Sequence, residues 1–263
     1  MPSIFGYLSA EVDWCEENFK HSEYITEYYN TISNVGFFIV PPLMMWLNTQ
    51  YNNHRPVALR SLAIMEMFIG IFSLYFHMTL SYAGQLLDEL SILWTVGVSY
   101  ALWMPVRHFP RFIKTRDQFI WTTAIVTVLS TIMSFVKPTL NAYVLNCIAI
   151  HLFYLTAQNL KKCNNPRVHR VALSMTVWWM IAIACWITDK VLCGFCQRIN
   201  FCYLHSFWHI CISIAIFYCA TMIIYFDVLY DLPSSNPEVM YWPSNTSPIA
   251  LPYLVFQDSQ KLC

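Results

Sequence analysis

Charged residues are scarce in this chain of 263 residues: they make up 11% of it, against roughly a quarter of an ordinary soluble domain. Hydrophobic residues make up 57%, which argues strongly against a water-soluble globule. Neither sign of charge is in excess, because 15 Lys and Arg balance 15 Asp and Glu. The chain therefore lacks both the basic surplus of a nucleic-acid-binding protein and the acidic surplus that keeps a disordered chain solvated.

Glycine is also rare, and no signal sequence is expected. The 6 Gly stand beside 18 Phe, 16 Tyr and 10 Trp, which favours helices packed in lipid over strands joined by tight turns. We expect no cleavable signal peptide, since residues 1–30 contain several carboxylates and no apolar run. The 10 Cys are scattered, with one close pair at Cys193 and Cys196, so neither a disulfide-rich scaffold nor a four-cysteine zinc module is indicated.

Apolar stretches near the ~20 residues that cross a bilayer recur along the chain. They lie at about 31–49, 59–80, 86–106, 118–136, 140–159, 171–192 and 204–229. The pattern predicts an all-α membrane protein, a bundle of seven transmembrane helices. We therefore divide the chain into an N-terminal segment (1–30), a seven-helix transmembrane domain (31–230) and a C-terminal tail (231–263).

Basic residues fall unequally on the two sides of these spans. The side of the N-terminus holds Lys20, Lys137, Lys190 and Arg198. The other side holds Arg55, Arg60, Arg107, Arg111, Lys114, Arg116, Lys161, Lys162, Arg167, Arg170 and Lys261. Because cytosolic loops are enriched in Lys and Arg, we expect a lumenal N-terminus and a cytosolic C-terminus. The glycosylation sequon at Asn245 would then stay unused.

Five polar residues from three spans are expected to meet at one depth of the membrane. Ser73 and His77 end the second span, Asp88 begins the third, and His205 and His209 open the seventh. The i, i+4 spacing puts His205 and His209 on one face of their helix. Ionisable groups are costly in lipid and usually mark function, so these residues are the candidate site.

Three such histidines are the ligand set of an open zinc site that keeps a water in its fourth position. Zinc would lower the pKa of that water towards ~7. Asp88 could take its proton and pass it to a leaving amine, and Ser73 could donate a hydrogen bond to a developing oxyanion. These parts suit hydrolysis of an amide or ester. The alternative is a structural membrane protein whose histidines hydrogen-bond one another.

Among the other ionisable residues within the spans, which are Glu66, Glu89, His151, Asp189, Lys190 and Asp227, two are given a role. Glu66 shares the helix face of Ser73 and His77 but sits about three turns away from His77, which favours a cavity lining or an interhelix hydrogen bond over catalysis. His151 has no partner at the level of the candidate site, so we assign it to helix packing or a hydrogen bond.

The N-terminal segment carries an acidic cluster, Asp13-Trp-Cys-Glu-Glu-Asn18, with Glu27 further on. Several carboxylates and an amide oxygen can wrap Ca²⁺, which takes six to eight oxygen ligands. The cluster is not an EF-hand, because the twelfth position from Asp13 is Tyr24. A solvated acidic face is the alternative interpretation.

Five motifs, taken in this order, closely resemble the alkaline ceramidases, seven-span zinc amidases related to the adiponectin and progestin receptor family. The resemblance covers nearly the whole chain. The motifs are Asp13-Trp-Cys-Glu-Glu-Asn18, Glu27-Tyr-Tyr-Asn-Thr-Ile-Ser-Asn34, Ser73-Leu-Tyr-Phe-His77-Met-Thr-Leu, Gln85-Leu-Leu-Asp-Glu-Leu90 and His205-Ser-Phe-Trp-His209.

The resemblance implies hydrolysis of the ceramide amide to sphingosine and a free fatty acid, at the membrane of the endoplasmic reticulum or Golgi. Ceramide and the bilayer are then the partners, with no nucleic acid and no obligate protein partner. By position, His77, His205 and His209 resemble the family's zinc ligands, and Ser73 and Asp88 its catalytic neighbours. A receptor of the adiponectin and progestin type is the alternative function.

The resemblance also implies a calcium site and a disulfide. Calcium would be held by the side chains of Asp13, Glu16, Asn18 and Glu27 and by the backbone carbonyl of Trp14. It would pin the N-terminal segment over the bundle and so activate the enzyme. A disulfide between Cys15 and Cys193 would tie that segment to the loop before His205. Cys196 is a rival partner, and free thiols are the other alternative.

Overall fold

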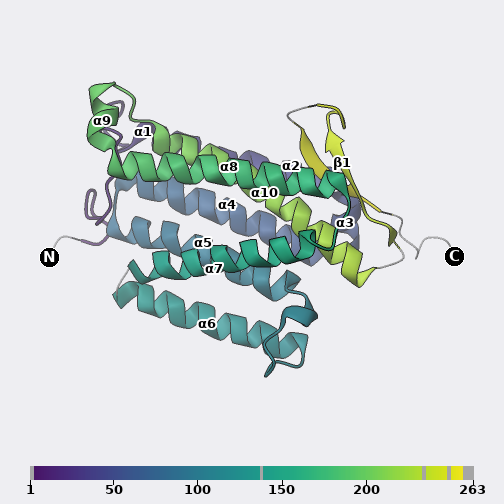
Figure 1. Cartoon of the computed structure of the whole chain (residues 1–263). Helices are drawn as coiled ribbons and strands as arrows, with labels where there is room; N and C mark the ends of the chain where they lie inside the picture. Colours follow the sequence, from purple (N-terminus) through teal and green to yellow (C-terminus); the bar gives the residue numbers. More distant parts are fainter. Residues whose placement is uncertain (1–2, 137–138, 233–234, 248–249, 257–263) are drawn as a thin grey trace.

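The computed structural model describes residues 3–136, 139–232, 235–247 and 250–256. Long helices lie lengthwise beside one another and make up most of it (Figure 1). The helices are α1 (Tyr28–Ser33), α2 (Gly36–Leu47), α3 (Thr49–His54), α4 (Pro56–Thr79), α5 (Tyr82–Trp103), the 3₁₀ helix η1 (Val106–His108), α6 (Arg116–Val136), α7 (Thr139–Leu160), α8 (Pro166–Val191), α9 (Cys193–Arg198) and α10 (Leu204–Asp231).

Six of the predicted spans each coincide with one long helix, from α4 to α8 and α10. The first, at 31–49, is instead divided among α1, α2 and α3. An asparagine side chain stands at each break: Asn34 Nδ2 donates to the Asn30 carbonyl at 2.9 Å, and Asn48 Nδ2 to the Met44 carbonyl at 3.0 Å. Such side-chain donors compete with the backbone for helical carbonyls and favour a helix end.

Four of the described helices are long and apolar enough to cross a membrane: α4, α6, α8 and α10. The count of seven spans and the orientation of the termini stay predictions. Helix α10 is the most buried of these four, whereas Phe119 and Ser134 are the buried side chains of α6. The exposed α6 residues include Trp121, Ile125 and Leu129, a surface suited to lipid.

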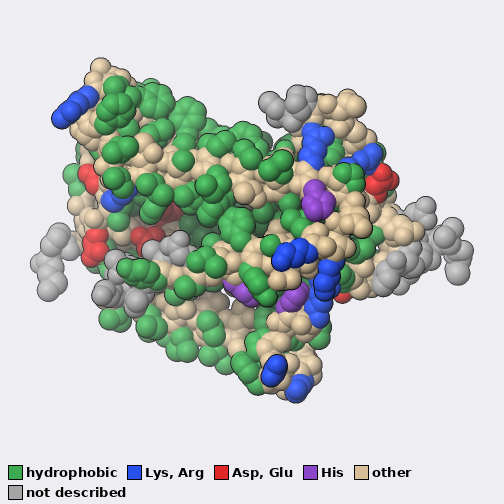
Figure 2. Space-filling view, viewed as in Figure 1, with side chains coloured by type: hydrophobic (Ala, Val, Ile, Leu, Met, Phe, Trp, Pro, Cys, Tyr) green, Lys and Arg blue, Asp and Glu red, His purple; other side chains and the backbone are tan. Residues whose placement is uncertain are grey.

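Charge is distributed unevenly over the face shown in Figure 2. Hydrophobic side chains cover the middle of the bundle, and most Lys and Arg side chains gather toward the end that carries the C-terminal tail. Lys137 and Lys261 of the predicted asymmetry lie outside the described residues. On this face, more Lys and Arg side chains therefore lie at the end of the C-terminal tail than at the other end, as the sequence predicts.

The C-terminal tail corrects the all-α expectation, because part of it folds as a β-hairpin. Strands β1 (Glu238–Trp242) and β2 (Leu251–Val255) pair antiparallel, with Glu238 opposite Val255. Alternate residues are buried, such as Val239 and Tyr241 on β1, as expected when one face of a strand pair packs on a core. The hairpin is anchored by Leu254 N–H, which donates to Asn48 Oδ1 on the bundle at 3.0 Å.

The N-terminal segment covers the opposite end of the bundle, where α4 stops. Carbonyls at a helix end have no donor within the helix, and here they accept from backbone N–H groups of the N-terminal segment. The bonds run from Glu27 to His77 (3.0 Å), Thr26 to Met78 (3.0 Å), Leu8 to Thr79 (3.1 Å) and Ala10 to Leu80 (2.9 Å). This pairing places Glu27 directly beside His77.

Candidate metal centre

His77 from α4 and His205 and His209 from α10 form a buried cluster. Their candidate ligand atoms all lie within 4.8 Å of one another, and the part of the chain that the structure describes holds no second group this close. The Nε2 atoms of His77 and His205 are 3.3 Å apart. Two nitrogens bound to tetrahedral zinc at ~2.0–2.1 Å would be about 3.3–3.4 Å apart. The spacing therefore fits a shared metal ion.

Hydrogen bonds set which ring nitrogens are free for a metal. The single hydroxyl proton of Ser33 is donated to the Asn30 carbonyl at 3.0 Å. Toward His209 the Ser33 oxygen can then only accept, so it receives Nδ1–H at 2.7 Å. His77 Nδ1–H donates to the Glu27 carboxylate at 2.5 Å. Both rings therefore keep the Nε2 lone pair for the centre, as metal-binding histidines require.

His205 is held by ring stacking. Its ring centroid lies 3.7 Å from that of Trp14, at an interplanar angle of 23°, and its Nδ1 has no hydrogen-bond partner among the described residues. The next residue, Cys15, forms a disulfide with Cys193, with the two Cα atoms 5.2 Å apart. Cys15 N–H also donates to Asp189 Oδ2 at 3.0 Å. The N-terminal segment is thus attached over the histidine cluster.

Ser73 links the histidine cluster to Asp88. Its hydroxyl oxygen lies 3.4 Å from His209 Nε2, and its side chain also interacts with the carboxyl group of Asp88 in the second turn of α5. Ser73 is buried one turn before His77 on α4. The five polar residues that the sequence places at one depth are therefore drawn from α4, α5 and α10 into one neighbourhood.

The acidic residues of the N-terminal segment have different hydrogen-bond partners. Asp13 interacts with Glu27 and accepts from Asn18 Nδ2 at 3.3 Å, while Asn18 Oδ1 is buried without a hydrogen-bond donor among the described residues. Glu16 instead accepts the backbone N–H groups of Tyr29 and Asn30, at 2.7 and 2.8 Å. It therefore caps the first turn of α1, where an anion is favoured.

Burial raises the pKa of Glu27 to about 8 and also raises the pKa of Glu16, an effect that the two backbone donors oppose. Both carboxylates would therefore gain from a nearby cation. The orphaned oxygen of Asn18 adds a further oxygen ligand. These donors are of the kind that Ca²⁺ prefers, so the residues present fit a calcium ion.

Glu27 connects the acidic cluster to the histidine cluster. Its Oε1 accepts Trp14 N–H at 3.1 Å, and its Oε2 accepts both His77 Nδ1–H and Asn30 Nδ2 at 2.5 and 3.0 Å. The contacts of Ser33 and Glu27 with the histidines were not predicted from the sequence. A stripe of small polar residues at helical spacing, Asn30, Ser33 and Asn34, was the available signal.

Two expectations for isolated polar residues have different outcomes. Glu66 is fully buried, but neither carboxylate oxygen has a hydrogen-bond partner in the described ranges. The prediction of an interhelix hydrogen bond for Glu66 is therefore wrong. His151 Nδ1 pairs with the Tyr100 hydroxyl at 2.8 Å, which agrees with the expected hydrogen bond. Cys193, and not its rival Cys196, is the disulfide partner of Cys15, because Cys196 is a buried free thiol.

Comparison with known proteins finds relatives that match this chain over nearly its full length. A family model described as Ceramidase matches residues 6–255. Alkaline ceramidase 1 of Homo sapiens is 47% identical over 264 residues, covering 100% of both chains. Alkaline ceramidase 1 of Mus musculus is 47% identical over 264 residues, covering 100% of this chain and 97% of its own. Alkaline ceramidase of Drosophila melanogaster is 36% identical over 254 residues, with 96% and 90% covered.

Proposed function

The chain belongs to the ceramidase family, and on this premise we propose that it hydrolyses the amide bond of ceramide to sphingosine and a free fatty acid. The observation that carries the proposal is the buried histidine cluster with Ser73 and Asp88 beside it. A receptor function is not favoured, because the relatives at 47% identity are named for ceramidase activity.

We propose zinc as the metal at His77, His205 and His209. When bound there, zinc would polarise the amide carbonyl and activate a water molecule. The histidines would hold the ion through Nε2, as the spacing of 3.3 Å between His77 and His205 supports. Asp88 accepts the proton of the attacking water and delivers it to the leaving amine nitrogen. Ser73 donates a hydrogen bond to the carbonyl oxygen as negative charge develops on it.

A calcium ion at the N-terminal segment would support this centre from outside. Asp13, Asn18, Glu16, Glu27 and the backbone carbonyl of Trp14 would hold it. Glu27 orients His77, and the Trp14 ring stacks on His205, so an ion that orders these two residues also orders two of the three histidines. The expected effect is activation and stabilisation without a chemical role.

We place the enzyme in the membrane of the endoplasmic reticulum or Golgi, with seven spans, a lumenal N-terminus and a cytosolic C-terminus. The unequal Lys and Arg distribution supports this orientation. The histidine cluster then lies at the lumenal level of the bundle. The acyl and sphingoid tails of ceramide would occupy apolar surface within reach of lipid.

The activity test uses purified full-length protein, zinc, calcium and ceramide in mixed micelles at alkaline pH, with released sphingosine quantified by chromatography. Asp88→Asn and His209→Ala should each lose at least about 100-fold in rate, and His209→Ala should also lose stoichiometric zinc. His151→Gln is the matched control, because His151 pairs with Tyr100 away from the cluster. Absence of sphingosine release by the unmodified protein would refute the proposed activity.

Calcium binding is tested by the rise in melting temperature on adding CaCl₂. A ligand at 100 times its Kd stabilises by about 2.7 kcal/mol, so the unmodified protein should show a clear rise. Asn18→Ala should reduce it. Glu17→Ala should not, because Glu17 is exposed and pairs with Lys20 at 2.7 Å. Equal responses in both variants would remove Asn18 from the site.

A further inference from the structure

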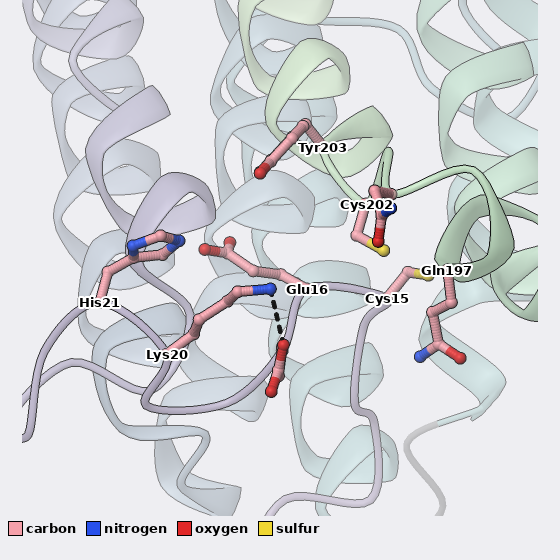
Figure 3. A pocket seen from close by; sticks show the side chains of 9 residues that line it. Cys15, Glu16, Lys20, His21, Gln197, Cys202 and Tyr203 are labelled. Carbon is pink, nitrogen blue, oxygen red and sulfur yellow. Dashed lines mark ion pairs between the residues drawn. The ribbon is translucent and has the colours of Figure 1, made fainter.

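A cavity of about 520 Å³ lies beside the N-terminal segment, outside the histidine cluster. Its wall comes from the segment 15–21, from the end of α9 and from the loop between α9 and α10 (Figure 3). Polar side chains dominate the wall, among them Glu17 and Lys20, which form an ion pair. The cavity therefore admits water and polar solutes.

Two sulfur-bearing residues face this cavity from opposite segments, Cys15 and Cys202 (Figure 3). Cys15 is bonded to Cys193, whereas Cys202 is a partly exposed free thiol. Cys193 is not among the residues that line the cavity. A nucleophile in the cavity therefore meets the disulfide from the Cys15 side.

The end of α9 places Cys202 on the cavity wall. Asn200 adopts a left-handed conformation with φ of 55°, which Asn tolerates better than most residues. Asn200 N–H then donates to the Gln197 carbonyl at 3.1 Å and Phe201 N–H to the Cys196 carbonyl at 2.9 Å. This pattern reverses the chain at a helix end. Cys196, on α9 itself, stays buried and outside the cavity lining.

The surroundings of Cys202 make its thiol a slow nucleophile. Burial raises its pKa, the nearby Cys196 adds to the rise, and Lys20 opposes it. The attacking species in thiol–disulfide chemistry is the thiolate. Its population is therefore small, but Cys202 shares one cavity with a disulfide sulfur and needs no diffusing partner.

We propose that Cys202 is a thiol–disulfide exchange site for the Cys15–Cys193 disulfide. The Cys202 thiol loses its proton to water, and its sulfur attacks Sγ of Cys15. A Cys15–Cys202 bond forms, the Cys15–Cys193 bond breaks, and Cys193 leaves as a thiolate that takes up a proton. One disulfide and one thiol are present before and after, so the step needs no external oxidant or reductant.

The exchange moves the attachment point of the N-terminal segment. Before it, Cys15 is tied to the first residue of α9, and afterwards to a residue three positions before His205. Trp14, which stacks on His205, is next to Cys15 in the chain. The two cross-links therefore attach the N-terminal segment, which lies over the histidine cluster, to different points of the chain between α8 and α10. This inference concerns the cross-link itself and stands whether or not the chain hydrolyses ceramide.

The test is disulfide mapping of the full-length protein by mass spectrometry. The protein is equilibrated in glutathione redox buffers, quenched with acid, alkylated and digested without reductant. We expect a Cys15–Cys202 peptide beside the Cys15–Cys193 peptide in the unmodified protein, and a Cys15–Cys202 peptide as the main cross-link in Cys193→Ser. Cys202→Ser should lose the new peptide in every buffer.

Cys196→Ser is the matched control, because it removes a nearby free thiol, on α9, that does not line the cavity. It should leave the map unchanged. A Cys193→Ser protein in which Cys15 pairs with Cys196 instead would overturn the proposal. So would the absence of a Cys15–Cys202 peptide from the unmodified protein at every glutathione ratio. Neither readout involves ceramide, so the result is separate from the activity test.

Discussion

Replacing Ser33 by alanine isolates the contribution of a hydrogen bond to metal affinity. Ser33 lies on α1, does not touch the proposed metal position and accepts His209 Nδ1–H at 2.7 Å. Without it, the buried N–H of His209 loses its acceptor, and the ring is free to rotate or to change tautomer. The three proposed ligands and the fold of α10 remain in place, so zinc should still bind, but more weakly.

The size of the effect follows from the role of such bonds. Loss of a hydrogen bond that orients a metal-binding histidine typically costs 10–100-fold in metal affinity, which is about 1.4–2.8 kcal/mol at 1.4 kcal/mol per factor of ten. The Ser33 bond is short, and Ser33 is buried with 8% of its surface exposed. Water is therefore a poor substitute for the lost oxygen, and we expect a loss within this range.

The assay is a competition titration of the purified protein with a chromogenic zinc chelator, which gives the Kd for zinc. Ser134→Ala is the control, because Ser134 is also buried and donates to the carbonyl of Ser130 on its own helix. Ser33→Ala should weaken zinc binding and Ser134→Ala should not. An unchanged Kd in Ser33→Ala would refute the tautomer argument.

Three further outcomes are expected. Arg55→Met should lower the free energy of unfolding by about 1–3 kcal/mol, because it leaves the buried Asp227 carboxylate without the cation that lies 2.6 Å from it. This range is smaller than for a fully buried pair, since the Arg55 side chain is one third exposed. A double-mutant cycle with Asp227→Asn measures the effect. Glu66→Leu should raise the melting temperature, because it removes two buried oxygens that lack donors; a fall would reveal a partner for them. A sequon engineered near Lys20 should be glycosylated in microsomes and Asn245 should not, and the reverse pattern would invert the topology.

The positions of six long helices could be read from the sequence, because a helix that crosses lipid needs a long apolar run. Two of the three histidines could be paired for the same local reason, since His205 and His209 lie one turn apart on α10. The first span was less accessible, because Asn34 and Asn48 interrupt it with side-chain hydrogen bonds that hydropathy does not register.

The C-terminal hairpin shows a different limit. Its strands are five residues each, and such short alternations are common by chance in a chain rich in Tyr and Trp. What stabilises them is the bundle, through Tyr218 and Asn48, which bond Ala250 and Leu254. Periodicity within the tail carries no information about those partners.

The sequence by itself determined the membrane class, the apolar helices and the residue types of a candidate metal site, because these follow from composition and local spacing. Only the tertiary structure decided that Ser33 orients His209, that Glu27 orients His77 and that Cys202 shares a cavity with Cys15. Those pairs are separated by 50 to 187 positions. Their contacts exist because the exposed carbonyls at the end of α4 bind the N-terminal segment, and no local pattern encodes where a distant segment will satisfy its hydrogen bonds.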